Sequence, residues 1–206
     1  MCLEVPKLIL LFSGKRKSGK DTVTDILYER LSLRKPVLLF HRVKDVAVNI
    51  KLSAPIKSHF ANSQGLDFDQ LMGTGDYKEQ YRLEMIKWSE DIRNSDNGYF
   101  CRAAVDMSGA MKKPVWIVTD MRRRTDLQWF RENYKNIVTV RVSSTEDERQ
   151  KRGWVFTSGI DDQETECDLD TIKEWDVVIE NNGTLCDLQP MIDQLVERIN
   201  LAAQNS

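Results

Sequence analysis

The chain has 206 residues, of which 41% are hydrophobic and 30% are charged. These proportions are ordinary for a folded globular protein and exclude a chain that is disordered throughout. Thirty Lys and Arg residues nearly balance thirty-two Asp and Glu residues, for a net charge of −2. A dedicated binder of duplex nucleic acid, which usually carries a basic excess, is therefore disfavoured. The length predicts a single domain over residues 1–206.

The sequence shows no obvious targeting or membrane-spanning segment. The longest apolar run near its start, Leu8–Phe12, is too short for a transmembrane helix or a signal peptide. Four scattered cysteines without a C-x-x-C pair favour reduced thiols. The last residues do not match a peroxisomal signal of the Ser-Lys-Leu type. We therefore expect a cytoplasmic protein, without a nucleic-acid or membrane partner.

Apolar runs alternate with segments of helical periodicity along the chain. Leu8–Phe12 fits a strand buried on both faces, and apolar residues recur at helical spacing over Lys20–Leu31. Further strands are expected at Val46–Leu52, Val115–Val118, Ile137–Val142 and Trp175–Ile179, and further helices at Tyr77–Arg93, Tyr99–Met111, Thr125–Tyr134, Thr145–Lys151 and Leu185–Leu201. This alternation predicts an α/β fold with helices on both faces of a parallel sheet. Pro36–Asp45 is expected to be an unusual connector before the second strand.

A phosphate-binding motif lies between the first strand and the first helix. The segment Gly14–Lys20 fits G-x-x-x-x-G-K, the P-loop spacing. Glycines permit a compact loop whose backbone N–H groups face a phosphate, and the following helix points its positive dipole end at the same place. The predicted nucleotide-binding residues are Gly14, Lys15, Arg16, Lys17, Ser18, Gly19 and Lys20.

Two features of the motif leave alternatives open. Asp21 stands where Ser or Thr usually helps to hold Mg²⁺, and its carboxylate could ligate magnesium or cap the helix. The loop interior, Lys15–Lys17, carries three cations. These are either solvated charges or extra charge neutralisation for a second anionic substrate.

Further cations follow the second and third predicted strands. Arg82 and Arg93 are eleven residues apart and are expected on one helix face, where they bind an anion or pair with nearby acids. Lys78 and Arg102 lie in the same helical stretch. Arg122 and Arg123 follow the third strand, at the sheet edge where open α/β sheets bind ligands. Asp120 at that strand's end is either a magnesium ligand or a cap.

The segment 146–170 has the composition of a lid. Arg149 and Arg152 precede Gly153, and Gly159 follows, which suggests a mobile segment that closes over phosphates and excludes water; the alternative is an ordinary surface loop. The acidic stretch Asp161–Asp170 is expected to be structure-poor and solvated rather than a metal site. Only two histidines are present, neither near a candidate nucleophile, which disfavours hydrolytic triads and zinc. Phosphoryl transfer needs only positioning and cations.

The chain resembles the animal-type phosphomevalonate kinase family over nearly its whole length. The resemblance is carried by Leu10–Asp21, Tyr77–Glu79 with Trp88, Gly98–Arg102, Arg122–Arg123 with Gln128–Arg131, Arg152–Thr157 and Val178–Asn181. The resemblance implies a five-stranded parallel sheet ordered 2-3-1-4-5, a substrate-binding helical region about 54–112 and a mobile lid. It also implies Mg²⁺-dependent transfer of the γ-phosphate of ATP to mevalonate 5-phosphate in isoprenoid and sterol biosynthesis, by a protein that is expected to be a monomer.

The resemblance also implies roles for individual residues. Lys17, Lys20, Arg122 and Arg123 are implied to be catalytic. The ATP site is implied to add Asp21, Arg149, Arg152 and Asn182 to the P-loop residues. The acceptor site is implied to contain Lys57, Lys78, Arg82, Arg93, Arg102, Arg122, Arg123 and Asn181. Magnesium is assigned to Asp21 and Asp120.

Two features of the sequence differ from the family pattern, and two other classes of nucleotide-binding protein are alternatives to this interpretation. Pro36–Asp45 looks inserted relative to the family, and Asn182 stands where mammalian members carry histidine. A nucleoside monophosphate kinase of the same fold is the first rival, which the family-specific segments disfavour. A guanine-nucleotide switch is the second, and the chain lacks its N-K-x-D tetrapeptide.

Overall fold

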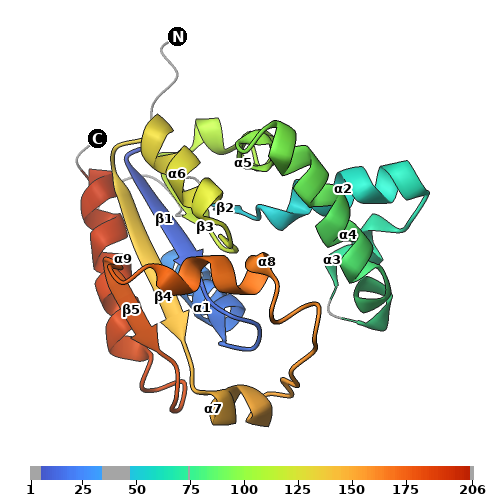
Figure 1. The fold of residues 1–206 in the computed structure, drawn as a ribbon. Helices are drawn as coiled ribbons and strands as arrows, with labels where there is room; N and C mark the ends of the chain where they lie inside the picture. The colour runs from blue at the N-terminus through green and yellow to red at the C-terminus, as the bar shows by residue number, and fades with distance from the viewer. Residues whose placement is uncertain (1–5, 34–46, 74, 205–206) are drawn as a thin grey trace.

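The computed structural model describes residues 6–33, 47–73 and 75–204. Its centre is one sheet of five parallel strands in the order β2-β3-β1-β4-β5, which confirms the predicted order (Figure 1). The strands are β1 (Leu8–Ser13), β2 (Ala47–Ile50), β3 (Val115–Val118), β4 (Ile137–Ser143) and β5 (Val177–Glu180). The expected connector Pro36–Asp45 and the first residue of the predicted second strand, Val46, lie outside the described residues.

Helices cover both faces of the sheet because the strand residues are apolar on both sides. In β1, Leu8, Leu10 and Phe12 pack with α1 (Lys20–Leu33) and α9 (Gln189–Gln204). Ile9 and Leu11 pack on the other face with α5 (Tyr99–Met107) and α6 (Arg124–Asn133). Every residue of β1 is buried, as its continuous apolar run predicts.

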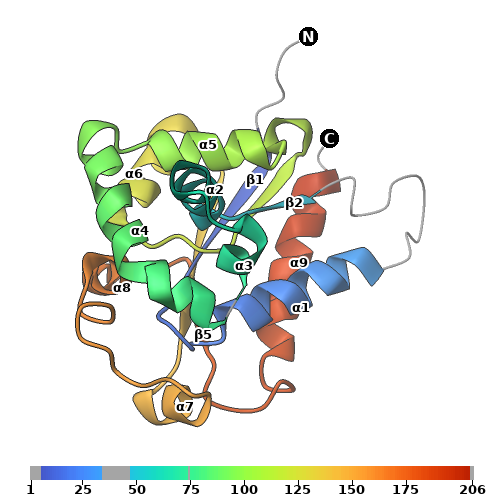
Figure 2. The same ribbon diagram turned by 90° about the vertical axis from the view of Figure 1, so that its right-hand side faces the viewer.

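Three helices form a helical arm beside the sheet, with a small core of its own (Figure 2). They are α2 (Ser53–Gln64), α3 (Phe68–Met72) and α4 (Asp76–Ser95). Phe60, Leu71 and Met85 are buried in this core. Apolar periodicity predicted only α4 as a separate helix, although the family resemblance implied a helical region about 54–112. Helix α2 begins at a cap supplied by Asp120, 68 residues away from Leu52, so no local signal marks its start.

Two predicted helices have different ends. The helix expected to reach Met111 stops at Met107, because Gly109 adopts φ +63° before a short 3₁₀ turn, η2 (Ala110–Lys112). The last helix begins at Gln189 rather than Leu185. Asp187 accepts hydrogen bonds from the backbone and side chain of Thr184, which fixes a turn ahead of that helix.

The lid segment, residues 146–170, contains α7 (Glu146–Lys151) and α8 (Glu164–Cys167). A 3₁₀ turn, η3 (Asp168–Thr171), follows. The prediction of a structure-poor, solvated acidic stretch was therefore wrong. Its carboxylates pair with arginines and lysines from distant parts of the chain, and those partners are invisible to local periodicity. Among the described residues, no helix combines the length and hydropathy needed to span a membrane.

Candidate active site

The P-loop requires glycine at both of its motif positions. A Cβ at residue 14 would lie 2.6 Å from Ser18 Oγ and 2.7 Å from the carbonyl oxygen of Val142. Gly19 has φ +87°, and a Cβ there would lie 2.0 Å from Nδ2 of Asn181. Lys17 also adopts a positive φ, of 61°, a conformation that costs a residue with a side chain on the order of 1 kcal/mol. The loop is thus held in a conformation that its own local preferences disfavour.

Lys20 is held at the first turn of α1 by two oxygen atoms. Its Nζ lies 2.6 Å from the carbonyl oxygen of Thr119, just after β3, and 2.5 Å from Oδ1 of Asp21. The residue is 7% exposed. A buried ammonium between the P-loop and the end of β3 is placed to bind a phosphate at this edge of the sheet.

Asp21 projects from the first turn of α1, and its side chain is 88% exposed. Desolvation by its surroundings works against the charged carboxylate, but Lys20, Arg122 and Lys51 outweigh it and hold the pKa of Asp21 below its ordinary value. Among the described hydrogen bonds its carboxylate accepts one from Lys20 and caps no backbone N–H. An exposed, ionised carboxylate beside a phosphate loop suits a hard divalent cation.

Two cavities meet at Lys20 and Asp21. The first, the P-loop cavity, has a volume of about 320 Å³. It is lined by Lys15, Arg16, Lys17, Gly19, Lys20, Asp21, Thr22 and Arg152. The second, the lysine cavity, has about 250 Å³ and opens between the sheet edge and the helical arm. It is lined by Lys20, Asp21, Thr24, Asp25, Asn49, Lys51, Ser53, Lys57, Met72, Gly73, Lys78, Thr119 and Asp120.

Four lysines line the lysine cavity, together with three aspartates, Asp21, Asp25 and Asp120. Lys57 on α2 is 8% exposed, and burial, reinforced by Lys78, lowers its pKa to about 8. Burial and Arg82 also lower the pKa of Lys78. Cations held together against their mutual repulsion form a site that an anion stabilises.

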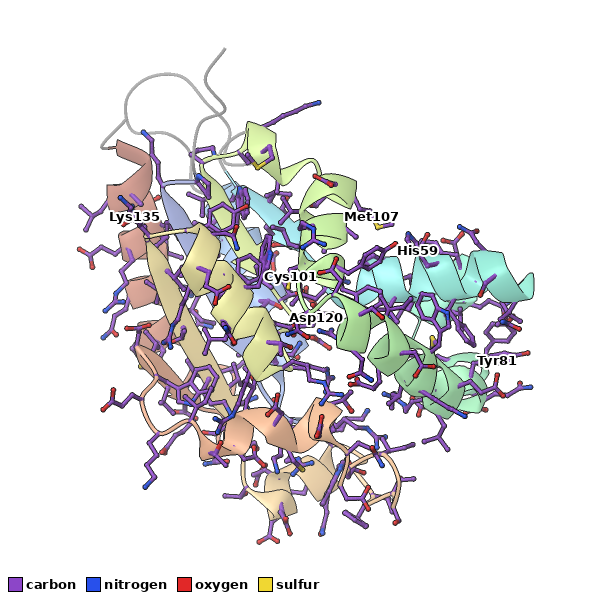
Figure 3. The ribbon with its side chains drawn as sticks, turned by 45° about the horizontal axis from the view of Figure 1, so that its top comes forward. His59, Tyr81, Cys101, Met107, Asp120 and Lys135 are labelled. Carbon is purple, nitrogen blue, oxygen red and sulfur yellow. The ribbon has the colours of Figure 1, made fainter. Side chains whose placement is uncertain are left out.

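Asp120 serves as a cap in this structure. Its Oδ1 accepts from the backbone N–H of Leu52 at 2.6 Å and its Oδ2 from that of Ser53 at 3.1 Å, at the start of α2. Figure 3 shows Asp120 where the sheet meets the helical arm. Of the two alternatives for this residue, the contacts favour the cap, and its assignment to magnesium stays a prediction.

Arg122 and Arg123 have different surroundings although they are adjacent. Arg122 is 32% exposed and pairs through Nη1 with Glu166 of the lid segment. Arg123 is buried, with Nη1 2.6 Å from Glu164 and Nη2 paired with Glu90 of α4. The contacts of Arg123 favour a structural tie between helices, whereas Nε and Nη2 of Arg122 have no partner among the residues that the structure describes.

The other predicted arginines do not gather at one point. Arg93 is buried against Asp126, with Nη1 2.7 Å from its carboxylate. Arg102 lies on α5 rather than on the long helix, and it pairs with Asp96 at the surface. Arg82 binds Glu79 through two nitrogens, one at 2.6 Å. The pairing with nearby acids that the sequence left open is thus observed for Arg82.

The lid segment docks on the P-loop through its two arginines. Arg149 stacks over Trp154, 3.9 Å from the ring centroid, and donates from Nε to the carbonyl oxygen of Arg16 at 2.9 Å. Arg152 donates to the carbonyl oxygen of Ser18 at 3.3 Å. The structure therefore brings both arginines to the P-loop, but Arg152 alone of the two lines its cavity.

Asn181 and Asn182 follow β5. Their side chains form hydrogen bonds to the P-loop and to the residue before α7. Asn181 is 7% exposed and donates to the carbonyl oxygen of Ser18 at 2.9 Å. Asn182 accepts the backbone N–H of Thr145 at 2.8 Å, next to the start of α7. Asn181, assigned to the acceptor by resemblance, lies under the P-loop and is absent from the lining of the lysine cavity.

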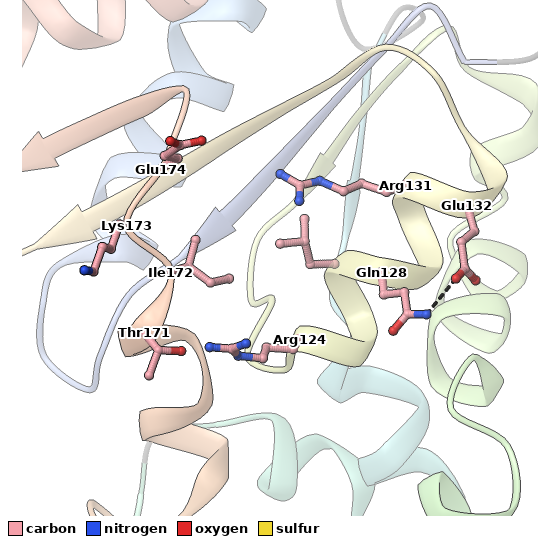
Figure 4. A pocket seen from close by; sticks show the side chains of 9 residues that line it. Arg124, Gln128, Arg131, Glu132, Thr171, Ile172, Lys173 and Glu174 are labelled. Atoms are coloured by element: carbon pink, nitrogen blue, oxygen red, sulfur yellow. Dashed lines mark hydrogen bonds between the residues drawn. The ribbon is translucent and has the colours of Figure 1, made fainter.

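A larger hollow of about 710 Å³ lies elsewhere, between α6 and the segment 171–174 (Figure 4). Arg124, Arg131 and Lys173 line it together with Glu132 and Glu174. It contains neither a P-loop residue nor the end of β3. Because it lies apart from the P-loop, there is no reason to place the phosphate chemistry there.

Several residues of the lysine cavity were not predicted from the sequence, among them Asn49, Lys51 and Thr24. Lys51 directly follows β2, so the rule that drew attention to Arg122 after β3 would also have found it. Glu166 was missed because its partners, Arg16 and Arg122, are far away in the sequence.

Comparison with known proteins identifies the family. The family model described as phosphomevalonate kinase matches residues 12–136, which contain the P-loop, the helical arm and Arg122. The chain belongs to the phosphomevalonate kinase family. A curated phosphomevalonate kinase from Drosophila melanogaster is 42% identical over 197 residues, 94% of this chain and 97% of its own length.

One solved structure also supports the fold. The crystal structure of TT1252 from Thermus thermophilus matches with a TM-score of 0.53 and 17% identity, over 95% of this chain and 98% of that one. At this identity the likeness concerns the fold alone. The five-stranded parallel sheet of this phosphomevalonate kinase family member thus has a counterpart in a second protein.

Proposed function

We propose that this member of the phosphomevalonate kinase family transfers the γ-phosphate of ATP to mevalonate 5-phosphate, giving the 5-diphosphate and ADP. The observation that carries the proposal is the pair of cationic cavities that share Lys20 and Asp21. One cavity is bounded by the P-loop and suits the triphosphate of ATP. The other contains Lys51, Lys57 and Lys78 and suits a phosphorylated acceptor. The product would serve the mevalonate route to isoprenoids and sterols.

The reaction needs no protein nucleophile. An oxygen of the acceptor phosphate attacks the γ-phosphorus while the bond to the β,γ-bridging oxygen breaks, and ADP leaves with that electron pair. A phosphate monoester is largely dianionic near pH 7, because its second pKa is about 6. It therefore attacks without a general base. The task of the protein is to hold two anions together and to stabilise charge on the transferred group.

Individual residues take roles that follow from their positions. Lys20 sits between both cavities and neutralises the transferred phosphoryl group, with Arg122 close enough to lower the pKa of the same Asp21. Lys57 and Lys78 bind the acceptor phosphate. Arg152 stabilises the P-loop from the lid segment.

Kinases of this kind use ATP with a divalent metal, and we assign that metal as Mg²⁺ held by Asp21. The exposed, ionised carboxylate of Asp21 fits a cation that prefers carboxylate, phosphate and water oxygens. When bound, Mg²⁺ neutralises charge on the triphosphate. Asp120 fits less well, because both of its carboxylate oxygens already accept backbone N–H groups.

An acceptor panel tests the proposal. ADP release from Mg-ATP is followed with mevalonate 5-phosphate, AMP, CMP and shikimate as acceptors, at matched enzyme concentration. We expect turnover with mevalonate 5-phosphate to exceed that with each other acceptor by at least about 100-fold, since buried polar groups left unpaired by a wrong acceptor are costly. No turnover with mevalonate 5-phosphate would refute the proposed function, and turnover with AMP would favour a nucleoside monophosphate kinase.

A further inference from the structure

Glu166 joins two parts of the site that are distant in the sequence. Its Oε2 accepts the backbone N–H of Arg16, in the P-loop, at 3.0 Å, and its Oε1 pairs with Nη1 of Arg122, just after β3. The carboxylate side chain is 4% exposed. Because both partners are held by one buried carboxylate on α8, the orientation of Arg122 depends on docking of the lid segment.

Only one nitrogen of the Arg122 guanidinium, Nη1, forms hydrogen bonds to residues that the structure describes. Nη1 pairs with Glu166 and donates to the carbonyl oxygen of Thr165 at 3.3 Å. Its Nε and Nη2 make no hydrogen bond to any residue that the structure describes. An arginine fixed through one nitrogen presents the remaining donors of its planar fork in a defined direction.

The neighbouring Arg123 is held through both ends of its guanidinium, while its buried Nε has no hydrogen-bond partner among the described residues. Both terminal nitrogens of Arg123 bind carboxylates, those of Glu164 and Glu90, and the side chain is 6% exposed. Arg123 therefore has little left to offer a substrate. The contrast indicates that Glu166 prepares Arg122 for a ligand, whereas Glu90 and Glu164 tie Arg123 to the helices.

Glu166 occupies one P-loop N–H, that of Arg16, but only one nitrogen of Arg122. A carboxylate that stood in for a phosphate would occupy the fork of Arg122 through two parallel hydrogen bonds. Glu166 uses Nη1 alone and reaches the P-loop through the backbone of Arg16. It thus leaves three N–H donors of Arg122 unoccupied, on Nε and Nη2.

We propose that Glu166 is a positioning residue for phosphoryl transfer, which holds Arg122 toward the transferred phosphate when the lid segment is docked on the P-loop. The inference rests on the proposed function. Glu166 itself touches no substrate. Its effect passes through Arg122, so removing it lowers the rate of the transfer step while ATP still binds to the P-loop cavity.

The test compares the full-length wild type with Glu166→Gln. Glutamine keeps the shape and one acceptor oxygen, so one of the two ties is lost. We expect kcat to fall by about 10- to 100-fold. KM for both substrates and the Kd of ATP should stay within about twofold, since uniform binding is retained. A wild-type kcat, or a Kd for ATP or tripolyphosphate that tightens, would overturn the proposal.

The matched control is Asp168→Asn in the same acidic segment. Asp168 accepts the backbone N–H of Arg124 at 2.8 Å and lines neither cavity, so its kcat should stay at the wild-type value. Thermal melting of each variant corrects for unfolded protein. If Glu166→Gln does not fold, Glu166→Asp, which keeps the charge but shortens the reach, should show the same fall in kcat, and its failure to do so overturns the proposal.

A double-mutant cycle separates positioning from general damage. In an Arg122→Lys background, Glu166→Gln should lower kcat by no more than about twofold, because the two residues act as one unit. Additive losses in the cycle would show that Glu166 acts independently of Arg122. If the wild type proves to use another phosphate acceptor, the proposed function fails, and the same cycle with that acceptor still tests Glu166.

Discussion

The side-chain amide of Asn181 fills the space that a Cβ on residue 19 would need. A methyl group at Gly19 would lie 2.0 Å from Nδ2 of Asn181, and the same nitrogen donates to the carbonyl oxygen of Ser18 at 2.9 Å. Asn181, which directly follows β5, therefore packs against the P-loop and helps to hold its conformation. Two independent constraints, this contact and φ +87°, restrict the position to glycine.

Gly19→Ala should weaken ATP binding by at least about 100-fold, because the loop must move to relieve the contact and its N–H groups then miss the phosphates. The Kd of ATP, measured by calorimetry, checks this. Gly109→Ala is the matched control. Gly109 has a similar φ, +63°, but nothing within 4 Å of the added Cβ. Equal losses in both variants would contradict the role given to Asn181.

Lys20→Met should abolish turnover and leave the fold intact. The ammonium lies between both cavities, 2.6 Å from the carbonyl oxygen of Thr119, and loss of one positioned cation in phosphoryl transfer costs about 10³-fold or more in kcat. Steady-state kinetics and far-UV circular dichroism measure the two effects. Lys173→Met, an exposed lysine that lines neither cavity, should have wild-type kinetics. Turnover by Lys20→Met at the wild-type rate would remove Lys20 from the mechanism.

The sequence suffices to predict the strands and the P-loop, because both are encoded locally, whereas the strand order was implied by the family resemblance. Continuous apolar runs mark strands buried on both faces, and Gly14–Lys20 follows the first of them. The same information could not tell Arg122 from Arg123. Their partners, Glu166 and Glu164, come from α8, more than forty positions further along the chain, and local periodicity contains no record of such pairs.

Apolar periodicity failed to mark helix α2 for the same reason. Its start is fixed by the carboxylate of Asp120, which follows β3, rather than by a capping residue beside it. The acidic lid segment was also misinterpreted. A run of carboxylates is normally solvated, and here Asp161 and Asp170 pair with cations of the P-loop and β4, while Glu166 pairs with Arg122 after β3. Long-range charge pairing, unlike apolar periodicity, becomes visible only in the fold.

Alanine variants of the two adjacent arginines should fail in different ways. Arg122→Ala removes a side chain that is about one-third exposed and has donors available for phosphate, so kcat should fall by about 10³-fold while the melting temperature changes little. Arg123→Ala removes a buried side chain that joins Glu90 of α4 to Glu164 of α8 and should cost about 1–3 kcal/mol of the free energy of unfolding. Calorimetric melting and kinetics per folded molecule separate the effects. A catalytic loss without a stability loss in Arg123→Ala would restore Arg123 as a catalytic residue.

We expect the positive charge of Lys57 to lower the stability of the folded protein and to help bind the acceptor phosphate. Its pKa is lowered from 10.5 to about 8 by burial and by Lys78, so the charged form is disfavoured in the folded protein. Between pH 8 and 10.5 the unfolded chain binds a proton that the folded protein has lost. The contribution of this group to stability therefore rises with pH through that window. At pH 7 its charge opposes folding by at most about 3 kcal/mol.

Lys57→Met should accordingly melt at a higher temperature than the wild type at pH 7, with the difference shrinking as the pH rises from 8 toward 10. The same variant should raise KM for mevalonate 5-phosphate, and in the wild type KM should rise above pH 8 as Lys57 loses its proton. Lys87→Met, an exposed lysine on α4, is the control and should show neither effect. A lower melting temperature for Lys57→Met at pH 7 would mean that its ammonium is stabilised by the fold. The lysine cavity would then lack the unbalanced charge that makes it a phosphate site.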